Sequence, residues 1–475
     1  MAQPNCTGIT FGVELEFLCA GFDKPPRRSG GSSLSASATG SGYSYHNQEE
    51  WLIGWRRAAA AEVVRFAPHL PIAVKCYHSK LTAPVCPACW GLPGTDGAAV
   101  LSEGTGTRPS DVHAQYRYFL IKKEQLTQLQ SQLDWLCVEI SSPVFEQQEL
   151  LAGLPQIKQL VTALAQARME IRANKSCGLH IHVGPRGGMR LLDAKKLVTL
   201  VMMLEQPLLY EIAASYRKRC PSASTILTSR YKIMHDASKA DETLPKDDSE
   251  SMHEYLPWTR GTLRPLSWNN YEPEVCHDLL RLVWHTKSLW KLDKQLRHNG
   301  DNETGLGLCL RNPGELEFVN LDGYWDWDSD SSESSCRTKS SKWSNHVPEF
   351  EGSRCSTFEF RFSQMSFDVD VIKDWAALGC RLVDLAALPS VDFSCFVDKL
   401  LNVLVNSEEE DASCKRRRTL RLLELGDQNV RWDARIPRRD SSDGFAPRVS
   451  EPMSRPKPGV TSEDGLEDRL MFTRL

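Results

Sequence analysis

The sequence of 475 residues has little that would place the protein in or across a membrane. Its longest apolar stretch, residues 197–204, is much shorter than the roughly 18 residues that a membrane-spanning helix requires. Residues 1–7 lack the basic segment followed by an apolar segment that marks a secretory signal. We therefore expect an intracellular protein, cytoplasmic by default, without a membrane partner.

The sequence also lacks an excess of positive charge and a regular set of cysteine pairs. Its formal net charge of −4 argues against a general nucleic-acid binder, which usually presents a basic patch. The 15 cysteines are scattered and odd in number, which favours reduced thiols over a disulfide framework. One closer group could hold a structural zinc ion, although the second half of the usual four-ligand pattern is not evident. Its members are Cys76, His78, Cys86 and Cys89.

Apolar residues make up 41% of the chain, enough for a large core. Periodicity predicts helices over residues 51–66, 149–167, 191–212, 276–296, 371–388, 393–405 and 415–425, with a kink or restart at Pro207. Alternation predicts strands over residues 9–17, 116–121, 136–140, 177–184, 316–321 and 357–362. We expect one domain over residues 8–406, with disordered insertions near 25–45, 91–110, 236–254 and 326–346. A basic segment and a largely disordered tail then occupy residues 407–475.

Two basic clusters can each be interpreted in two ways. The run from Lys415 to Arg418 could be a nuclear-import signal, but a solvated helix start is the more frequent meaning of such a run. The second cluster follows the helix at 191–212 and could either meet phosphate or form a solvated helix end. Its members are Arg217, Lys218, Arg219 and Arg230.

The most informative stretch is CGLHIHVG, residues 177–184, which alternates like a strand. Its apolar side chains point one way, and His180 and His182 point the other. Two imidazoles on one strand face, about 7 Å apart, can serve one site. A half-buried strand with a solvated face would use Thr, Ser, Lys or Gln more readily than two histidines.

Three other strands repeat this design with carboxylates. In ITFGVELEF, Glu14 and Glu16 share the face opposite the phenylalanines and Val13. In LCVEI, Glu139 stands opposite the aliphatic row, and in TFEFRF, Glu359 and Arg361 stand opposite three phenylalanines. Each strand taken alone could be an ordinary surface strand, but the same choice of residue types recurs four times.

If these strands pair in one sheet, four carboxylates and two imidazoles converge on its polar face. Such a group is strongly unfavourable when buried unless cations neutralise it. Carboxylate oxygens with one imidazole suit Mg²⁺ or Mn²⁺, and Arg361 offers a bidentate contact for phosphate or carboxylate. Metal ions and an arginine beside a phosphate site indicate phosphoryl transfer.

In their order along the chain, GVELEF, VEISSP, SCGLHIHVG and TFEFRF resemble the amidoligase family of fungi and bacteria. That family is similar in turn to glutamate–cysteine ligase and glutamine synthetase. The resemblance extends over residues 8–388 and implies an α+β fold, in which a curved antiparallel sheet forms a funnel and helices pack on its outer face. The Ser-rich insertions point to a diverged fungal member.

The resemblance also implies an enzyme that uses ATP to activate a carboxylate as an acyl phosphate, which an amine then attacks to give an amide. By position in the motifs, Glu14, Glu16, Glu139, His180 and Glu359 would bind Mg²⁺ or Mn²⁺. His182 would lie near the nucleotide phosphates. Arg361 would stabilise the transferring phosphoryl group, and Glu139 and Arg361 would be the catalytic residues. The substrates would be small-molecule or peptide carboxylates and amines, including protein side chains, and nucleic acid would not be a partner.

Two departures from the family pattern concern the substrate pocket. The family often has an Asp-x-Ser element after the strand preceding VEISSP, whereas this chain has IKKEQL, with Glu124 as the acid and no following serine. The family also tends to follow its last strand with a Gly-Thr turn, where this chain has SQMSFD. Two other functions therefore remain open: a catalytically inactive descendant that binds nucleotide or peptide, and a metal-dependent amide hydrolase. The sequence lacks the His-Glu-x-x-His pattern of many such hydrolases.

Overall fold

The computed structural model describes residues 8–20, 45–76, 98–102, 114–123, 136–173, 176–219, 223–226, 229, 250–256, 273–297, 304–310, 356–405 and 411–436. Its strands are β1 (Ile9–Ala20), β2 (Ile72–Cys76), β3 (Ala99–Ser102), β4 (Phe119–Lys123), β5 (Leu136–Ser141), β6 (Phe145–Glu146), β7 (Glu170–Arg172), β8 (Gly178–Pro185), β9 (Leu306–Leu310) and β10 (Ser356–Gln364). Its principal helices are α1 (Tyr45–Phe66), α2 (Gln147–Leu151), α3 (Pro155–Gln166), α4 (Leu191–Leu204), α5 (Tyr210–Ile212), α7 (Glu250–Tyr255), α8 (Pro273–His285), α9 (Leu289–Leu296), α10 (Val369–Ala386), α11 (Ser390–Val405), α12 (Ala412–Leu422) and α13 (Asn429–Arg435).

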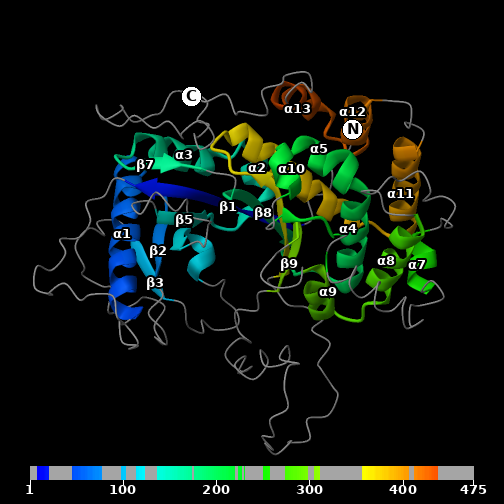
Figure 1. Ribbon diagram of the computed structural model, residues 1–475, viewed down its shortest axis with the longest axis horizontal. Helices are drawn as coiled ribbons and strands as arrows, with labels where there is room; N and C mark the ends of the chain where they lie inside the picture. The colour runs from blue at the N-terminus through cyan, green and yellow to red at the C-terminus, as the bar shows by residue number, and fades with distance from the viewer. Residues whose placement is uncertain are drawn as a thin grey trace, which may run out of the picture.

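The described strands form one open sheet of ten, ordered β3-β2-β4-β5-β1-β8-β10-β9, with β6 and β7 also paired to β1 (Figure 1). The α+β class with a large sheet and packed helices is therefore as predicted. The predicted antiparallel pairing holds for most of the sheet, and the exception is one edge, where β2 pairs in parallel with both β3 and β4. Parallel neighbours need long crossover connections, and the chain segments that leave and enter β2 are long enough to provide them.

The central strands turn one wholly apolar face toward helices. On β10, Phe358, Phe360 and Phe362 are all at most 2% exposed, as the alternation predicts. Each buried phenylalanine contributes roughly 2 kcal/mol to folding. Helix α10 packs against this face at β8 and β1 (Figure 1). The approach is close, since a Cβ on Gly379 would lie 3.0 Å from Val183. The helix thus fixes the apolar side of the strands whose other side carries the charged residues.

The helix predicted over residues 149–167 is broken into α2 and α3. Leu154 adopts a left-handed conformation with φ of 59°, and Gly153 before it has φ of 86°. Pro155 then begins α3, where its missing N–H is not needed. The apolar stripe runs across both helices, which is why periodicity alone does not reveal the break.

Two further predicted helices are interrupted at residues that explain the interruption. Pro207 lies in a π-helical segment, Glu205–Leu209, between α4 and α5, which confirms the predicted kink. The helix predicted over residues 276–296 is instead α8 and α9. Ser288 begins α9 as an N-cap, and its hydroxyl accepts a hydrogen bond from the Lys291 N–H.

Strand β9 was not predicted from the sequence, and neither were β2, β3, β6 and β7. A strand was predicted over residues 316–321, which lie outside the described residues, whereas Leu306–Leu310 pairs antiparallel with β10. This segment also follows the two-residue alternation: its leucines share one face, and Gly307 and Cys309 share the other. Four of its five residues are Gly or Leu, so its composition gives only a weak indication of a strand.

The largely disordered tail expected within residues 407–475 does not begin before residue 437, because residues 411–436 contain packed helices. Trp432 of α13 is 1% exposed and packs edge-on against Trp375 of α10, with ring centroids 5.7 Å apart. Arg431 and Arg435 both pair with the buried carboxylate of Asp374. Residues 411–436 therefore pack on the domain that was expected to end at residue 406. Two predicted insertions also contain regular structure, since β3 lies within residues 91–110 and α7 overlaps 236–254.

Candidate active site

The polar residues predicted from four separate strands lie on one face of the sheet. Residues directly opposite each other in neighbouring strands point to the same side, and the strand registers bring these residues into opposed pairs. All six side chains are buried, with exposed fractions between 2% and 8%. The pairs are Glu16 with Glu139, Glu14 with His180, and Glu359 with His182.

Three of these residues form a compact group of possible metal ligands. One ligand atom each from Glu14, His180 and Glu359 lies within 4.8 Å of the other two. His180 Nδ1 lies 3.0 Å from Glu359 Oε1 and 3.8 Å from Glu14 Oε2. Two carboxylates and one imidazole at this spacing fit a hard divalent cation such as Mg²⁺ or Mn²⁺. Glu16 lies close by, with Oε1 3.5 Å from His180 Nδ1.

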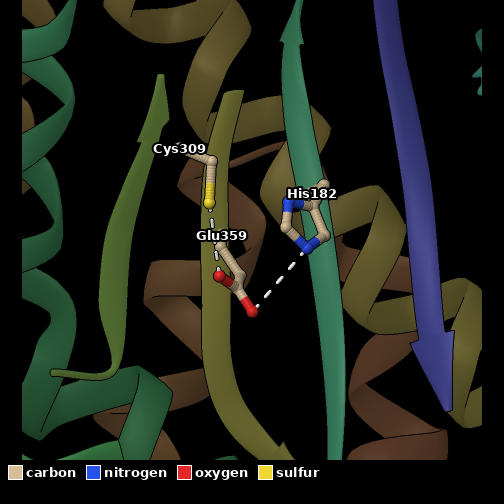
Figure 2. Close-up of side chains that lie close together, drawn as sticks. All are labelled: His182, Cys309 and Glu359. Carbon is tan, nitrogen blue, oxygen red and sulfur yellow. Dashed lines mark hydrogen bonds and ion pairs between the residues drawn. The ribbon is translucent and has the colours of Figure 1, made fainter. Parts of the chain in front are cut away.

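A second group of possible ligands shares Glu359 and includes a residue that the sequence analysis did not predict. His182, Cys309 and Glu359 each offer an atom within 4.8 Å of the other two (Figure 2). They come from three adjacent strands, β8, β9 and β10. The alternation of β9 is the signal that could have identified Cys309, since it places Gly307 and Cys309 opposite three leucines.

Two of the carboxylates are neutralised by a lysine from β4. Lys122 Nζ lies 3.2 Å from Glu14 Oε1 and forms a shorter ion pair with Glu139. The Ser141 hydroxyl lies between the same two acids, 2.7 Å from Glu139 Oε1 and 3.1 Å from Glu14 Oε1. Lys122 belongs to the IKKEQL stretch that departs from the family pattern, and Glu124 of that stretch lies outside the described residues. The ammonium group of Lys122 therefore occupies the position near Glu139 at which a metal ion was expected.

Arg361 lies at the other end of the polar row. Its Nη2 is 2.9 Å from the Glu359 carboxylate, and its side chain is 17% exposed. Arg217, from the predicted basic cluster, is fully buried and donates a hydrogen bond to the Arg361 carbonyl oxygen. Arg217 therefore holds the backbone of β10 at this point, and it is not on the solvated helix end that was one interpretation of the cluster.

Burial and charge act in opposite directions on the two acids of the first ligand group. Burial would raise the pKa of Glu14, but the charges of Lys122 and His182, with hydrogen bonds from His180 and His182, hold that pKa well below its usual value. Burial would also raise the pKa of Glu359, but the charges of Arg361, His182 and His180, with a hydrogen bond from His180, hold it well below its usual value. Both acids are therefore anionic at neutral pH, as a cation site requires.

The neighbouring pair, Glu16 and His180, differs because both of its pKa values are raised. Burial is the largest effect on Glu16 and raises its pKa, with Glu139 adding to the rise and His180 opposing it. For His180, burial would lower the pKa, but the charge of Glu16 and the hydrogen bonds that the imidazole donates to Glu14 and Glu359 raise it to about 10. His180 therefore carries a positive charge at neutral pH when the acids have no other counter-ion.

The position of His180 depends on a glycine two residues earlier. A Cβ on Gly178 would lie 2.5 Å from His180 Nε2 and 3.0 Å from Glu16 Oε2. The Gly178 N–H also donates a hydrogen bond to Glu16 Oε2, at 2.6 Å. Glycine is therefore needed at this position so that both side chains can occupy the space above the strand.

The other predicted sites either lie away from this face or include residues outside the described part of the chain. Cys76 is buried at the end of β2, while His78, Cys86 and Cys89 lie outside the described residues, so the zinc site stays a prediction. The basic run from 415 to 418 lies in α12, where Arg416 and Arg417 both pair with Asp433. No helix in the described part of the chain is long and apolar enough to cross a membrane.

One family comparison supports the resemblance drawn from the motifs. Residues 95–279 match a family model described as “Putative amidoligase enzyme”. The match contains Glu139, His180 and His182, and the structure brings Glu14 and Glu359, which lie outside it, onto the same face. No curated protein and no solved structure matches the chain. The amidoligase resemblance is therefore confirmed over this central segment, and it indicates an enzyme of the ligase type.

Proposed function

We propose, on the premise that residues 95–279 match the amidoligase family, that the protein is an ATP- and Mg²⁺-dependent carboxylate–amine ligase. Its substrates in this proposal are a small-molecule or peptide carboxylate and an amine. The proposal includes a funnel-like curvature of the sheet around the polar face, as in glutamine synthetase and glutamate–cysteine ligase. One observation carries the proposal: Glu14, His180 and Glu359 present ligand atoms within 4.8 Å of one another on a buried face beside Arg361.

The reaction has two steps whose atoms balance. A carboxylate oxygen of the first substrate attacks the γ-phosphorus of ATP, and ADP leaves with the electrons of the broken bond. The neutral amine of the second substrate then attacks the acyl carbon of the acyl phosphate. Inorganic phosphate leaves, the nitrogen loses a proton, and an amide bond remains.

The residues have distinct parts in this reaction. Glu14, His180 and Glu359 would hold Mg²⁺, with Mn²⁺ as a substitute, and the metal ion would neutralise phosphate charge when bound. Arg361 would shift from Glu359 to the transferring phosphoryl group once the ion neutralises that carboxylate. His182, beside Glu359 on the next strand, would lie near the nucleotide phosphates.

Glu16 and Glu139 complete the acidic row in this proposal. Glu139 would be a ligand or a catalytic base only when Lys122 releases it, because the two form a close ion pair. Glu16, with its raised pKa, would accept the proton that the attacking amine loses or bind a second cation. These roles follow from the charge and position of Glu16 and Glu139, and they differ from the role of Glu14, which is a metal ligand in this proposal.

Hydroxylamine provides a test that needs no knowledge of the natural amine. The full-length protein would be incubated with ATP, Mg²⁺ and a panel of amino acids and peptides that carry carboxylates. An acyl phosphate reacts with hydroxylamine to give a hydroxamate, so hydroxamate and ADP should form in equal amounts for at least one acid. Each should require both ATP and Mg²⁺.

The two other functions predict different results in the same assay. An inactive descendant would bind ATP but release neither ADP nor hydroxamate with any acid. A metal-dependent hydrolase would cleave amide substrates with the metal ion alone and would not need ATP. Either result would contradict the ligase proposal.

A further inference from the structure

The polar face contains a thiol that the ligase reaction does not use. Cys309 Sγ donates toward Glu359 Oε2 at 3.4 Å, and His182 Nε2 lies 3.6 Å from Glu359 Oε1 (Figure 2). The three side chains come from neighbouring strands β8, β9 and β10, whose backbones are tied by ladder hydrogen bonds. Their relative positions are therefore set by the sheet and not by a mobile loop.

These separations are those of a tetrahedral zinc site. With Zn–S of about 2.3 Å and Zn–N and Zn–O of about 2.1 Å, a tetrahedral ion would place its sulfur and oxygen ligands about 3.6 Å apart. Its nitrogen and oxygen ligands would lie about 3.4 Å apart. Cys309 Sγ lies 3.4 Å from Glu359 Oε2 and His182 Nε2 lies 3.6 Å from Glu359 Oε1, so each ligand is within about 0.2 Å of these values from one of the two oxygens of the carboxylate.

The imidazole of His182 is oriented for such an ion. Its Nε2 is buried among carboxylate oxygens, 3.1 Å from Glu14 Oε2 and 3.6 Å from Glu359 Oε1, and the whole residue is 8% exposed. The Thr357 hydroxyl lies 3.5 Å from the other ring nitrogen, Nδ1. Nε2 is thus the ring nitrogen that faces the acids, and a metal ion bound among them would take it as a ligand.

Strand β9 also leaves room at this position. Gly307 stands opposite Glu359, and a Cβ there would lie 3.8 Å from Glu359 Oε2. A side chain on Gly307 would therefore begin in contact with the Glu359 carboxylate. The polar row of β9 thus consists of one residue without a side chain and one thiol.

We propose that His182 Nε2, Cys309 Sγ and a Glu359 oxygen form a second cation site, selective for Zn²⁺. Imidazole, thiolate and carboxylate are the donors that Zn²⁺ prefers, whereas Mg²⁺ takes oxygen ligands. Three protein ligands leave the fourth tetrahedral position open for water or a substrate group. The two ligand groups share the Glu359 carboxylate, whose Oε1 lies near both histidines and whose Oε2 lies near Cys309. The site does not depend on the ligase reaction, because it needs neither ATP nor an amine.

Cobalt is the probe for this site, since Co²⁺ replaces Zn²⁺ and gives a thiolate charge-transfer absorption only when sulfur is bound. Chelator-treated full-length protein would be titrated with Co²⁺, with the near-ultraviolet difference spectrum as the readout. The wild-type protein should show a thiolate band that Zn²⁺ abolishes. Cys309→Ser should lose the band of this site and bind Zn²⁺ roughly tenfold more weakly or worse.

Two controls separate this site from other cysteines. Cys395→Ser removes an exposed thiol on α11 and should keep the full band. A Cys86→Ser/Cys89→Ser variant removes the other predicted zinc site and should keep the part of the band that depends on Cys309. Identical bands in the wild-type protein and Cys309→Ser, or complete loss in the Cys86/Cys89 variant, would overturn the proposal.

A second measurement needs no substitution at the site. Maleimide labelling of the wild-type protein, followed by peptide mass spectrometry, reports each cysteine separately. Zn²⁺ should slow the labelling of Cys309 at least tenfold and leave that of Cys395 unchanged, and Mg²⁺ should protect neither. Equal labelling of Cys309 with and without Zn²⁺ would also overturn the proposal. A protein that binds Zn²⁺ in this way but forms no hydroxamate would refute the ligase function alone.

Discussion

His180 Nδ1 lies 3.0 Å from Glu359 Oε1, although the two residues are far apart in the sequence. The contact joins β8 to β10 across the centre of the sheet, where both side chains are buried. A divalent cation bound here would displace the proton that His180 carries, because an imidazole nitrogen can bind a metal ion only without a proton.

Gly178→Ala should disturb the first ligand group without changing any ligand. The added methyl group would lie 2.5 Å from His180 Nε2, so the imidazole must move away from Glu14 and Glu359. We expect Mn²⁺ affinity to fall roughly tenfold to a hundredfold, as for other changes that misorient a ligand. Calorimetric titration with Mn²⁺ measures this.

The matched control for that prediction is Gly187→Ala, in the turn after β8. A Cβ there would meet nothing within 4 Å, so Mn²⁺ affinity should be unchanged. Equal Mn²⁺ affinity in both variants would show that His180 is not a ligand.

Lys122→Met should make the fold depend more strongly on a divalent cation. The change leaves Glu14 and Glu139 without the ammonium group that neutralises them, and removing one partner of such a buried ion pair costs about 3 kcal/mol. Mg²⁺ can replace part of the lost charge. Thermal unfolding should therefore show a lower Tm without Mg²⁺ and a larger increase on adding Mg²⁺ than in the wild-type protein.

Lys158→Met on α3, an exposed lysine, serves as the control for charge removal in general. Its Tm should respond to Mg²⁺ as the wild-type Tm does. If Lys122→Met shows the same Mg²⁺ response as Lys158→Met, the acids near Lys122 do not form part of a cation site.

Glu205→Gln should change how stability depends on pH. Burial raises the pKa of Glu205 from 4.5 to about 7, although Thr225 and the Ile226 N–H donate hydrogen bonds to it. Between these two values the folded protein keeps a proton that the unfolded chain has released. The contribution of Glu205 to stability therefore falls as pH rises from 4.5 to 7, and glutamine removes this loss.

A pKa raised from 4.5 to about 7 corresponds to about 3 kcal/mol. The difference in unfolding free energy between Glu205→Gln and the wild-type protein should therefore grow by about that amount from pH 4.5 to pH 8. Urea unfolding at several pH values measures it. A difference that stays constant over this range would show that Glu205 ionises normally in the folded state.

The polar and apolar faces of the central strands follow from the sequence because alternation is a local property. Phe358 and Phe360 identify the buried side of β10, and Glu359 between them must then face the other way. Cys309 and Lys122 were not predicted as site residues because their position depends on which strands are neighbours. That order is set by pairing between distant segments, and no local pattern records it.

The ends of elements were predicted less well than their faces. The break at Leu154 requires a left-handed residue within a continuous apolar stripe, and periodicity gives the same signal on both sides of it. Trp432 is buried because α13 packs on α10, where Trp432 contacts Trp375 and Arg431 pairs with Asp374. The composition around Trp432 is nevertheless typical of an exposed tail. In both cases tertiary contacts outweigh the local preference.

The central claim is that Glu359 holds a cation on which ATP turnover depends. Glu359→Gln keeps the size of the side chain and leaves the packing to Phe358 and Phe360, so the variant should still fold, with a Tm lowered by the loss of the ion pairs with His180 and Arg361. Glu146→Gln, at an exposed ion pair with Arg186, is the control.

The decisive measurement is ADP release with ATP, Mg²⁺, hydroxylamine and an active carboxylate substrate. The account predicts that Glu359→Gln retains less than about 1% of the wild-type rate, a loss of roughly 3 kcal/mol in transition-state stabilisation, while Glu146→Gln retains it all. A folded Glu359→Gln protein with the full rate would contradict the account.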